Sequence, residues 1–249
     1  MEVKQPLFRT ARLSVTYGGL AALTDLDLEI REHEIVGLIG PNGAGKTTAF
    51  NAITGVVKPS SGRVLFLGED ITGWRAPRIA AKGIARTFQN IRLYDDMTVI
   101  ENVMAAGHSL IRYSFLEAVV GLIEGKAAGL LEVMGLIEMA GDKASSLPYG
   151  SQRKLEIARA LALDPALLLL DEPVAGMNPM ETLEFGELLS KIHSDLGLTI
   201  GLIDHDMRFV MNVCHKIKVI DHGVQIAWGS PREIRDDEKV IAAYLGESA

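Results

Sequence analysis

Cysteine is almost absent from this sequence, which has one, Cys214, in 249 residues. One cysteine excludes a disulfide within the chain and is typical of a reducing compartment. Long apolar runs are missing too: the longest stretch without Asp, Glu, Lys or Arg is the dozen residues from Leu13 to Thr24. A helix needs about 20 apolar residues to cross a bilayer. The start, MEVKQPLFRT, lacks the apolar core of a signal peptide. We therefore expect a soluble chain, which can still dock on a membrane protein.

A surplus of positive charge is also lacking. Lys and Arg number 25 against 32 Asp and Glu, a net charge of −7. This balance argues against a surface that coats nucleic acid. The six histidines show no spacing typical of a protein metal site. What remains is an ordinary folded composition, 48% hydrophobic and 23% charged, in a chain long enough for one large domain or a core with a smaller lobe.

Apolar runs and helical patterns alternate along the chain. EIVGLIG (34–40) is continuously apolar, as is typical of a strand covered on both faces, and similar runs recur in ALLLLDE, LTIGLID and IKVID. Helical patterns between them include Thr47–Thr54 and Ser151–Leu163. LTDLDLEI (23–30) alternates apolar and polar residues like a half-buried antiparallel strand, and GRVLFLGED (62–70) suggests an antiparallel edge lobe. The sequence therefore predicts an α/β fold with a mainly parallel sheet.

The middle of the chain differs from both ends. Residues from about 95 to 147 are rich in Ala, Leu, Met and Glu, and no β-rich run interrupts them. We expect a packed helical subdomain there, inserted between residues 1–94 and 148–249, which together form the sheet core and its antiparallel lobe. The whole chain, 1–249, is then a single domain.

A phosphate-binding motif follows the first buried run. GPNGAGKTT fits G-x-x-x-x-G-K-[ST] between an apolar strand and a helix, which is the context that the motif requires. Its glycines let backbone N–H groups approach phosphate oxygens. Lys46 can reach the terminal phosphates, the Thr47 hydroxyl can bind Mg²⁺, and Thr48 can bond an inner phosphate. The predicted nucleotide site comprises Gly40, Pro41, Asn42, Gly43, Ala44, Gly45, Lys46, Thr47 and Thr48. The alternative is a glycine turn beside a surface lysine.

Two carboxylates follow the run LLLL (167–170). In open α/β sheets the carboxyl ends of the strands carry the ligands. Asp171 is therefore the predicted Mg²⁺ ligand, directly or through water, and Glu172 is placed to polarise an attacking water. Taken alone, they could equally be two solvated carboxylates at a strand end.

A second helix start raises a question that the first motif leaves open. LPYGSQ (147–152) opens a helix after a tight turn, and a helix N-terminus binds anions. The chain already holds a phosphate loop a hundred residues earlier, so the sequence contains two binding elements for one nucleotide.

The order of these motifs resembles that of ABC-transporter ATPases over essentially the whole chain. A phosphate loop, a glutamine in ARTFQN, the LPYGSQ helix start, the Asp-Glu strand and a histidine in GLIDHDM follow one another as in that family. The resemblance implies that Gln89 contacts the metal and senses nucleotide, that His205 senses the γ-phosphate, and that Tyr17 stacks on adenine. A solvated or core histidine, a polar loop glutamine and an edge-covering tyrosine are the alternatives for these three.

In that family two ATPase subunits pack head to tail. The resemblance therefore implies that Tyr149, Gly150, Ser151 and Gln152 face the ATP on the partner's phosphate loop, so that one nucleotide is held from both sides. The common signature of the family is Leu-Ser-Gly-Gly-Gln, from which this segment departs. Asn178, in AGMNP, stands where many relatives have Asp. We expect an altered contact across the dimer at that position.

YGSQ followed by LEIAR is similar to the ATPases of branched-chain amino acid importers, as are RTFQNIRLYDDMTVIEN and the ending AAYLGE. This resemblance implies ATP hydrolysis with Mg²⁺ at the cytoplasmic face of the inner membrane, with permease subunits as partners and a substrate-binding protein as an indirect one. An ATPase for urea or lipopolysaccharide transport is the nearest alternative. A soluble ABC ATPase of DNA repair or translation is the other, but the chain has no room for a long coiled coil and only one ATPase half.

Overall fold

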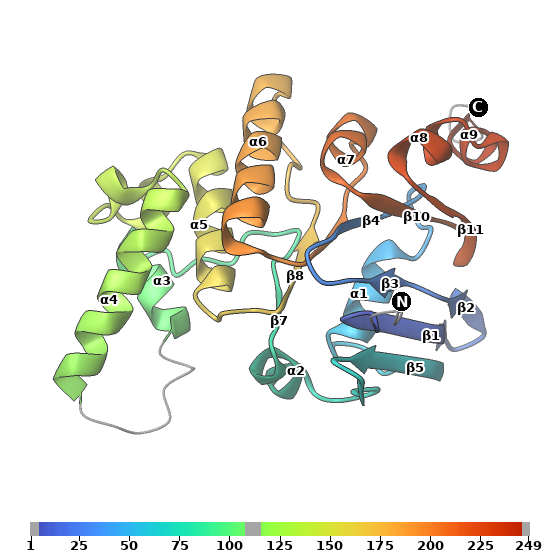
Figure 1. Cartoon of the computed structure of the whole chain (residues 1–249), viewed down its shortest axis with the longest axis horizontal. Helices are drawn as coiled ribbons and strands as arrows, with labels where there is room; N and C mark the ends of the chain where they lie inside the picture. The colour runs from blue at the N-terminus through green and yellow to red at the C-terminus, as the bar shows by residue number, and fades with distance from the viewer. Residues whose placement is uncertain (1–4, 108–115, 246–249) are drawn as a thin grey trace.

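The computed structural model describes residues 5–107 and 116–245. A sheet runs through the molecule, and a group of helices lies to one side of it, at the left of Figure 1. The strands follow the order β6-β5-β1-β2-β11-β10-β4-β9-β8-β7, and β3 pairs with β1. This arrangement confirms the predicted α/β class, with a P-loop core, an antiparallel lobe at one edge and a helical insert.

The parallel half of the sheet is formed by β10, β4, β9, β8 and β7. Their bounds are β4 Ile35–Ile39, β7 Ile84–Arg86, β8 Leu167–Asp171, β9 Ile200–Ile203 and β10 Lys216–Asp221. Every residue of β4, β8 and β9 is buried. Continuous apolar runs suit these strands because helices cover both faces; in Figure 1, α6 lies above β8 and α1 below β4.

The antiparallel half contains β1 Phe8–Tyr17, β2 Leu20–Leu26, β3 Glu29–Ile30, β5 Ser61–Phe66, β6 Glu69–Asp70 and β11 Val224–Gly229. The single strand expected over residues 23–30 is wrong, since β2 ends at Leu26 and β3 begins at Glu29. Buried Thr10 explains the break: its hydroxyl donates to the Leu26 carbonyl and accepts from the Leu28 N–H, each at 2.8 Å. These bonds replace ladder hydrogen bonds, so the strand divides.

Helices connect the strands. Their bounds are α1 Lys46–Ile53, α2 Ala76–Lys82, α5 Tyr149–Leu161, α6 Pro179–Leu196, α7 Met207–Val213, α8 Pro231–Arg235 and α9 Glu238–Leu245. The two predicted helices thus start one residue earlier (α1) and two residues earlier (α5) than expected. Asn178 caps α6, because its side-chain oxygen accepts from the Met180 and Glu181 N–H groups at 2.9 and 3.0 Å. An aspartate would cap the helix in the same way.

The middle of the chain is helical where it is described. It contains α3 Val99–Gly107 and α4 Leu116–Val133, followed by short 3-10 turns at Ile137–Met139 and Ala144–Ser146. Its apolar side chains share one buried cluster with α5 and β8. The subdomain boundaries near residues 95 and 147 stay a prediction.

Cys214 belongs to the same buried cluster as α5 and β8. Its Sγ lies 3.0 Å from the place that a Cβ on Gly37 would take.

Candidate active site

The phosphate loop turns sharply between β4 and α1, and its glycines are required by close backbone approach. A Cβ at Gly40 would lie 2.0 Å from the Ile220 carbonyl oxygen, and one at Gly45 would lie 2.5 Å from that of Ala22. Gly43 and Gly45 also have positive φ angles of 77° and 100°. Side chains would force the loop away from β2 and β10, so only glycine permits this path.

Lys46 begins α1 and folds back over the loop. Its side chain is buried, and its Nζ donates to the carbonyls of Gly40 at 2.6 Å and Pro41 at 2.8 Å. Thr47 and Thr48 follow in the first turn of α1, Thr47 exposed and Thr48 half-buried. An ammonium group, a helix N-terminus and two hydroxyls therefore gather at one place, as an anionic phosphate chain requires.

Asp171 ends β8, and its side chain is 3% exposed. Its Oδ2 accepts from Arg86 at 2.7 Å, and its Oδ1 has no hydrogen-bond partner within the described residues. A buried carboxylate oxygen without a donor fits a hard cation or its bound water. No three His, Cys, Asp or Glu side chains among the described residues form a metal site by themselves. This donor set suits Mg²⁺, which commonly takes one or two protein ligands and adds phosphate oxygens.

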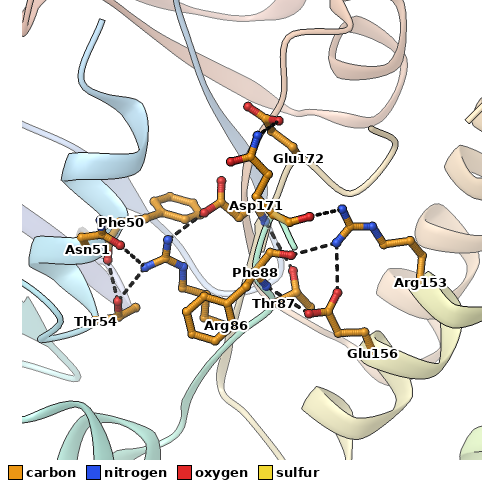
Figure 2. A network of polar contacts seen from close by, with 11 residues as sticks. Phe50, Asn51, Thr54, Arg86, Thr87, Phe88, Arg153, Glu156, Asp171 and Glu172 are labelled. Atoms are coloured by element: carbon orange, nitrogen blue, oxygen red, sulfur yellow. Dashed lines mark hydrogen bonds and ion pairs between the residues drawn. The ribbon is translucent and has the colours of Figure 1, made fainter. Parts of the chain in front are cut away.

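In Figure 2 the Glu172 carboxylate points upward from the strand end, whereas that of Asp171 points left toward Arg86. Its Oε2 accepts from Gln89 Nε2 at 2.8 Å, and His205 Nδ1 lies 4.0 Å away. The structure therefore brings together three predicted residues from segments far apart in the sequence. Glu172 is 17% exposed and His205 60% exposed, so water reaches this cluster from the histidine side.

Asp204 orients the loop that carries His205, a role that the sequence did not predict. The carboxylate is fully buried, and it accepts from the N–H groups of His205 at 2.8 Å and Asp206 at 2.9 Å. Burial raises the pKa of the Asp204 carboxyl, although these backbone bonds oppose the shift. Asp204 thus holds the backbone of the histidine loop.

The start of α5 lies away from the phosphate loop. In Figure 1, α5 lies to the left of β8 and α1 to its right. The Tyr149 ring would be 3.3 Å from a Cβ on Gly176, and Gln152 Nε2 donates to the Leu147 carbonyl at 2.9 Å. Apart from its chain neighbours and the backbone of its own helix, no heavy atom of the described residues lies within 4 Å of the place that a Cβ on Gly150 would take. Within one chain, the segment Tyr149–Gln152 is therefore separate from the phosphate loop. Tyr17, 48% exposed, lies at the end of β1.

Two buried arginines, which sequence reasoning missed, surround the segment that carries Gln89. Arg153 of α5 donates to the carbonyls of Phe88, at 2.8 Å, and of Gln89, and to Glu156 at 3.1 Å. Glu156 in turn accepts from the Phe88 N–H at 3.2 Å. Burial raises the pKa of the Glu156 carboxyl, with Arg153 acting in the opposite direction. Arg86 occupies the other side of this segment (Figure 2).

Two stretches of the chain match families of known proteins. The ABC transporter family matches residues 23–175, and a family described as branched-chain amino acid ATP-binding cassette transporter matches residues 225–249. The chain belongs to the ABC transporter ATPase family. As a member, this ABC ATPase binds nucleotide and hydrolyses ATP, which confirms the family and the enzyme activity inferred from the order of motifs.

Relatives and solved structures cover nearly the whole ABC ATPase chain. The high-affinity branched-chain amino acid transport ATP-binding protein LivG of Salmonella typhimurium is 44% identical over 99% of this chain and 100% of its own. BraF of Pseudomonas aeruginosa, which carries the same description, is 42% identical over the same shares. The lipopolysaccharide export ATP-binding protein LptB of Haemophilus influenzae is 34% identical over 94% of this chain and 95% of its own.

Solved structures of ATP-binding cassettes match the fold. The ADP conformation of MJ1267, an ATP-binding cassette of an ABC transporter, aligns with a TM-score of 0.87 and 30% identity over 98% of this chain and all of its own. The dimeric structure of MJ0796, a bacterial ABC transporter cassette, aligns with a TM-score of 0.79 and 25% identity over 90% and 99%. These likenesses support dimerisation and association with a transporter for this ABC ATPase. Across the described residues, no helix is both long and apolar enough to span a bilayer.

Proposed function

We propose that this ABC ATPase powers the import of branched-chain or other hydrophobic amino acids. Its identity to LivG and BraF, 44% and 42%, supports this substrate class, as does the family matched by residues 225–249. Lipopolysaccharide transport is the second candidate, and the lower identity to LptB, 34%, argues against it.

The assignment of the site rests on one observation: Glu172 contacts both Gln89 and His205 at the strand ends. In this proposal, Glu172 is the general base for water, His205 contacts the γ-phosphate, and Gln89 senses both the nucleotide and the metal. The phosphate-loop residues 40–48 hold ATP, with Lys46 at the terminal phosphates, and Tyr17 stacks on adenine. Thr47 and Asp171, with Gln89, hold Mg²⁺, which neutralises phosphate charge when bound.

Two subunits, identical or related, pack head to tail in the working enzyme. The separation of α5 from α1 supports this assembly, because Tyr149, Gly150, Ser151 and Gln152 can then meet the nucleotide of the partner subunit. Permease subunits bind the pair at the cytoplasmic face of the inner membrane, and a substrate-binding protein acts through them; nucleic acid is no partner.

The permease docks on a cleft beside the segment Gln89–Asp96. This cleft has a volume of about 380 Å³, and its walls include two guanidinium groups stacked on aromatic rings. Arg92 lies 4.3 Å from the Phe88 ring centre and Arg159 lies 4.7 Å from that of Tyr94. Since Phe88, the residue before Gln89, lines the cleft, motion at the nucleotide can reach the permease through a short path.

Replacing the proposed base tests the site and the dimer together. Glu172→Gln keeps the shape and hydrogen bonding of the side chain but cannot accept a proton. The variant should bind Mg²⁺ and ATP yet release no phosphate, so that uncleaved ATP holds two copies together. Gel filtration should show an ATP-dependent shift from monomer to dimer.

A second substitution tests the start of α5 in the same assay. Adding Ser151→Glu sets a carboxylate against the γ-phosphate and should abolish the shift, while ATP still binds the monomer. A Glu172→Gln, Ser151→Glu protein that still dimerises with ATP would mean that LPYGSQ is only a helix start.

A further inference from the structure

Arg86 joins two elements that carry proposed metal ligands. It is the last residue of β7, where it pairs with Leu169 of β8, and its side chain is 6% exposed. One terminal nitrogen donates to Asp171 Oδ2 at 2.7 Å. The other donates to Asn51 Oδ1 at 2.8 Å and Thr54 Oγ1 at 3.0 Å. A single guanidinium therefore connects the end of β8 to the end of α1 (Figure 2).

The surroundings of Arg86 fix its orientation. The ring centres of Phe88 and Phe50 lie 5.1 and 5.7 Å from its central carbon. The Thr54 hydroxyl donates to the Phe50 carbonyl at 2.7 Å, which leaves its lone pairs for Arg86. A planar guanidinium held between rings can bond both partners at once, whereas a lysine ammonium lacks this fixed fork.

Stability alone is a weak reason to keep such a pair. Arg86 and Asp171 are both almost fully buried, and removing two charges from water costs about as much as their attraction returns. Apolar side chains of similar volume would stabilise this place as well. The pair is better explained by the geometry that it imposes.

The hydrogen bonds of Arg86 select one carboxylate oxygen of Asp171 and one face of α1. Arg86 engages Oδ2 of Asp171, so the buried Oδ1 is the oxygen left to accept a cation or its water. On α1, Asn51 and Thr54 follow Thr47 by four and seven residues, and this spacing places all three on one face of the helix. Arg86, which also binds Asp171 at the end of β8, therefore contacts the face of α1 that carries Thr47.

We propose that Arg86 is a positioning residue for Mg²⁺: it holds Asp171 and the Thr47 face of α1 in the orientation in which both can bind the metal. The inference rests on the proposed roles of Asp171 and Thr47. Arg86 acts through these two elements and contacts neither metal nor nucleotide itself.

Nucleotide binding measured against Mg²⁺ concentration tests this role without using turnover. In the full chain carrying Glu172→Gln, a fluorescent N-methylanthraniloyl ATP is titrated with Mg²⁺, and separately bound in EDTA. Arg86→Lys should raise the Mg²⁺ concentration that gives half of the maximal fluorescence change by about tenfold or more. Losing a residue that orients a metal ligand typically weakens metal binding by such a factor. Binding in EDTA should stay at the value of the parent protein, because the phosphate loop is unchanged.

Arg78→Lys is the matched control, since Arg78 is exposed and stacks on Trp74 at 3.3 Å. It should leave both titrations unchanged. Asn51→Ala is the second variant: it removes one of the two bonds from the guanidinium to the α1 segment and keeps those to Thr54 and Asp171, so it should shift the Mg²⁺ titration by a smaller factor. This variant tests the inference even where Arg86→Lys does not fold.

Asp171→Asn separates this inference from the proposed function. If Asp171→Asn shifts the Mg²⁺ titration and Arg86→Lys and Asn51→Ala do not, the positioning role is wrong and the metal assignment stands. If Asp171→Asn has no effect, the metal assignment is wrong and the role of Arg86 falls with it. If Arg86→Lys weakens nucleotide binding by the same factor in EDTA and in Mg²⁺, Arg86 only supports the fold.

Discussion

At the scale of single residues, Glu172 has a backbone conformation that few side chains adopt. Its φ angle is 48°, in the left-handed region, while its N–H donates to the Ile203 carbonyl at 2.8 Å. Such a conformation is strained for a residue other than glycine, and strain of this kind clusters at active sites. The carboxylate that follows contacts Gln89 and His205, whereas that of the preceding Asp171 binds Arg86.

Lys46 provides the sharpest test at this scale. Lys46→Ala removes the charge directed at the terminal phosphates, so ATP turnover should be abolished. Phosphate release and nucleotide titration should both show the loss. Turnover at the rate of the unaltered protein would remove the phosphate-loop assignment.

Some of the site could be predicted from the sequence, for a physical reason. The phosphate loop depends on glycines and a lysine at fixed short spacing, so local sequence contains the whole motif. The Arg86 cluster does not: its partners lie 35, 32 and 85 residues away, and they meet only when β7, β8 and α1 assemble. Arg153, in an ordinary helical pattern, gives no sign of its burial.

At the scale of elements, α5 is fastened to the segment of Gln89 through Arg153. Arg153→Ala leaves Glu156 buried without its ion-pair partner and should lower the free energy of unfolding by about 3–5 kcal/mol. Urea denaturation measures the change. Lys154→Ala, on the next residue, is the control and should change stability by no more than about 0.5 kcal/mol. An equal loss in both variants would contradict the role of Arg153.

The end of α6 should make stability depend on pH. His193, in its last turn, lies with its ring centre 5.2 Å from that of His215. Burial lowers the pKa of His193 below 6.5, and the charges of His215 and His33 act in the same direction. The unfolded chain therefore takes up the proton first, so stability is full above about pH 6.5 and falls as pH decreases through the folded pKa.

Urea midpoints at pH 7.5, 6.5 and 5.5 measure this dependence. His193→Gln should flatten it, because the replacement does not titrate. His222→Gln is the control, since His222 is 95% exposed, and should keep the slope of the unaltered protein. An unchanged slope in His193→Gln would assign the pH dependence to other groups.

The strand boundaries of the antiparallel half could not be predicted from the hydrophobic pattern alone. β1 went unpredicted: its register shifts between Ala11 and Ser14, where Arg12 has a φ angle of 46°, so its buried positions change phase. The same strand supplies Thr10, which divides β2 from β3. Both features arise from pairing between strands, which a period along one segment does not report.

At the scale of the whole molecule, the docking cleft predicts where a permease binds. A cysteine at Arg92 or Tyr94 should cross-link to a membrane subunit when the transporter is assembled in membranes. Identification of the ligand of the co-purifying binding protein then tests the amino-acid assignment. A cysteine at exposed Lys58, in the antiparallel lobe, is the control and should capture no membrane subunit. Capture of soluble partners only would instead favour a non-transport ATPase.

The burial of Cys214 makes such labelling selective for the introduced cysteine. The thiol is 7% exposed against Gly37, and burial raises its pKa, so at neutral pH it stays protonated and shielded. Maleimide reagents need an accessible thiolate, and this chain has no other cysteine. A thiol introduced on the surface is therefore the reactive one in the folded protein, and attachment chemistry needs no cysteine-free background.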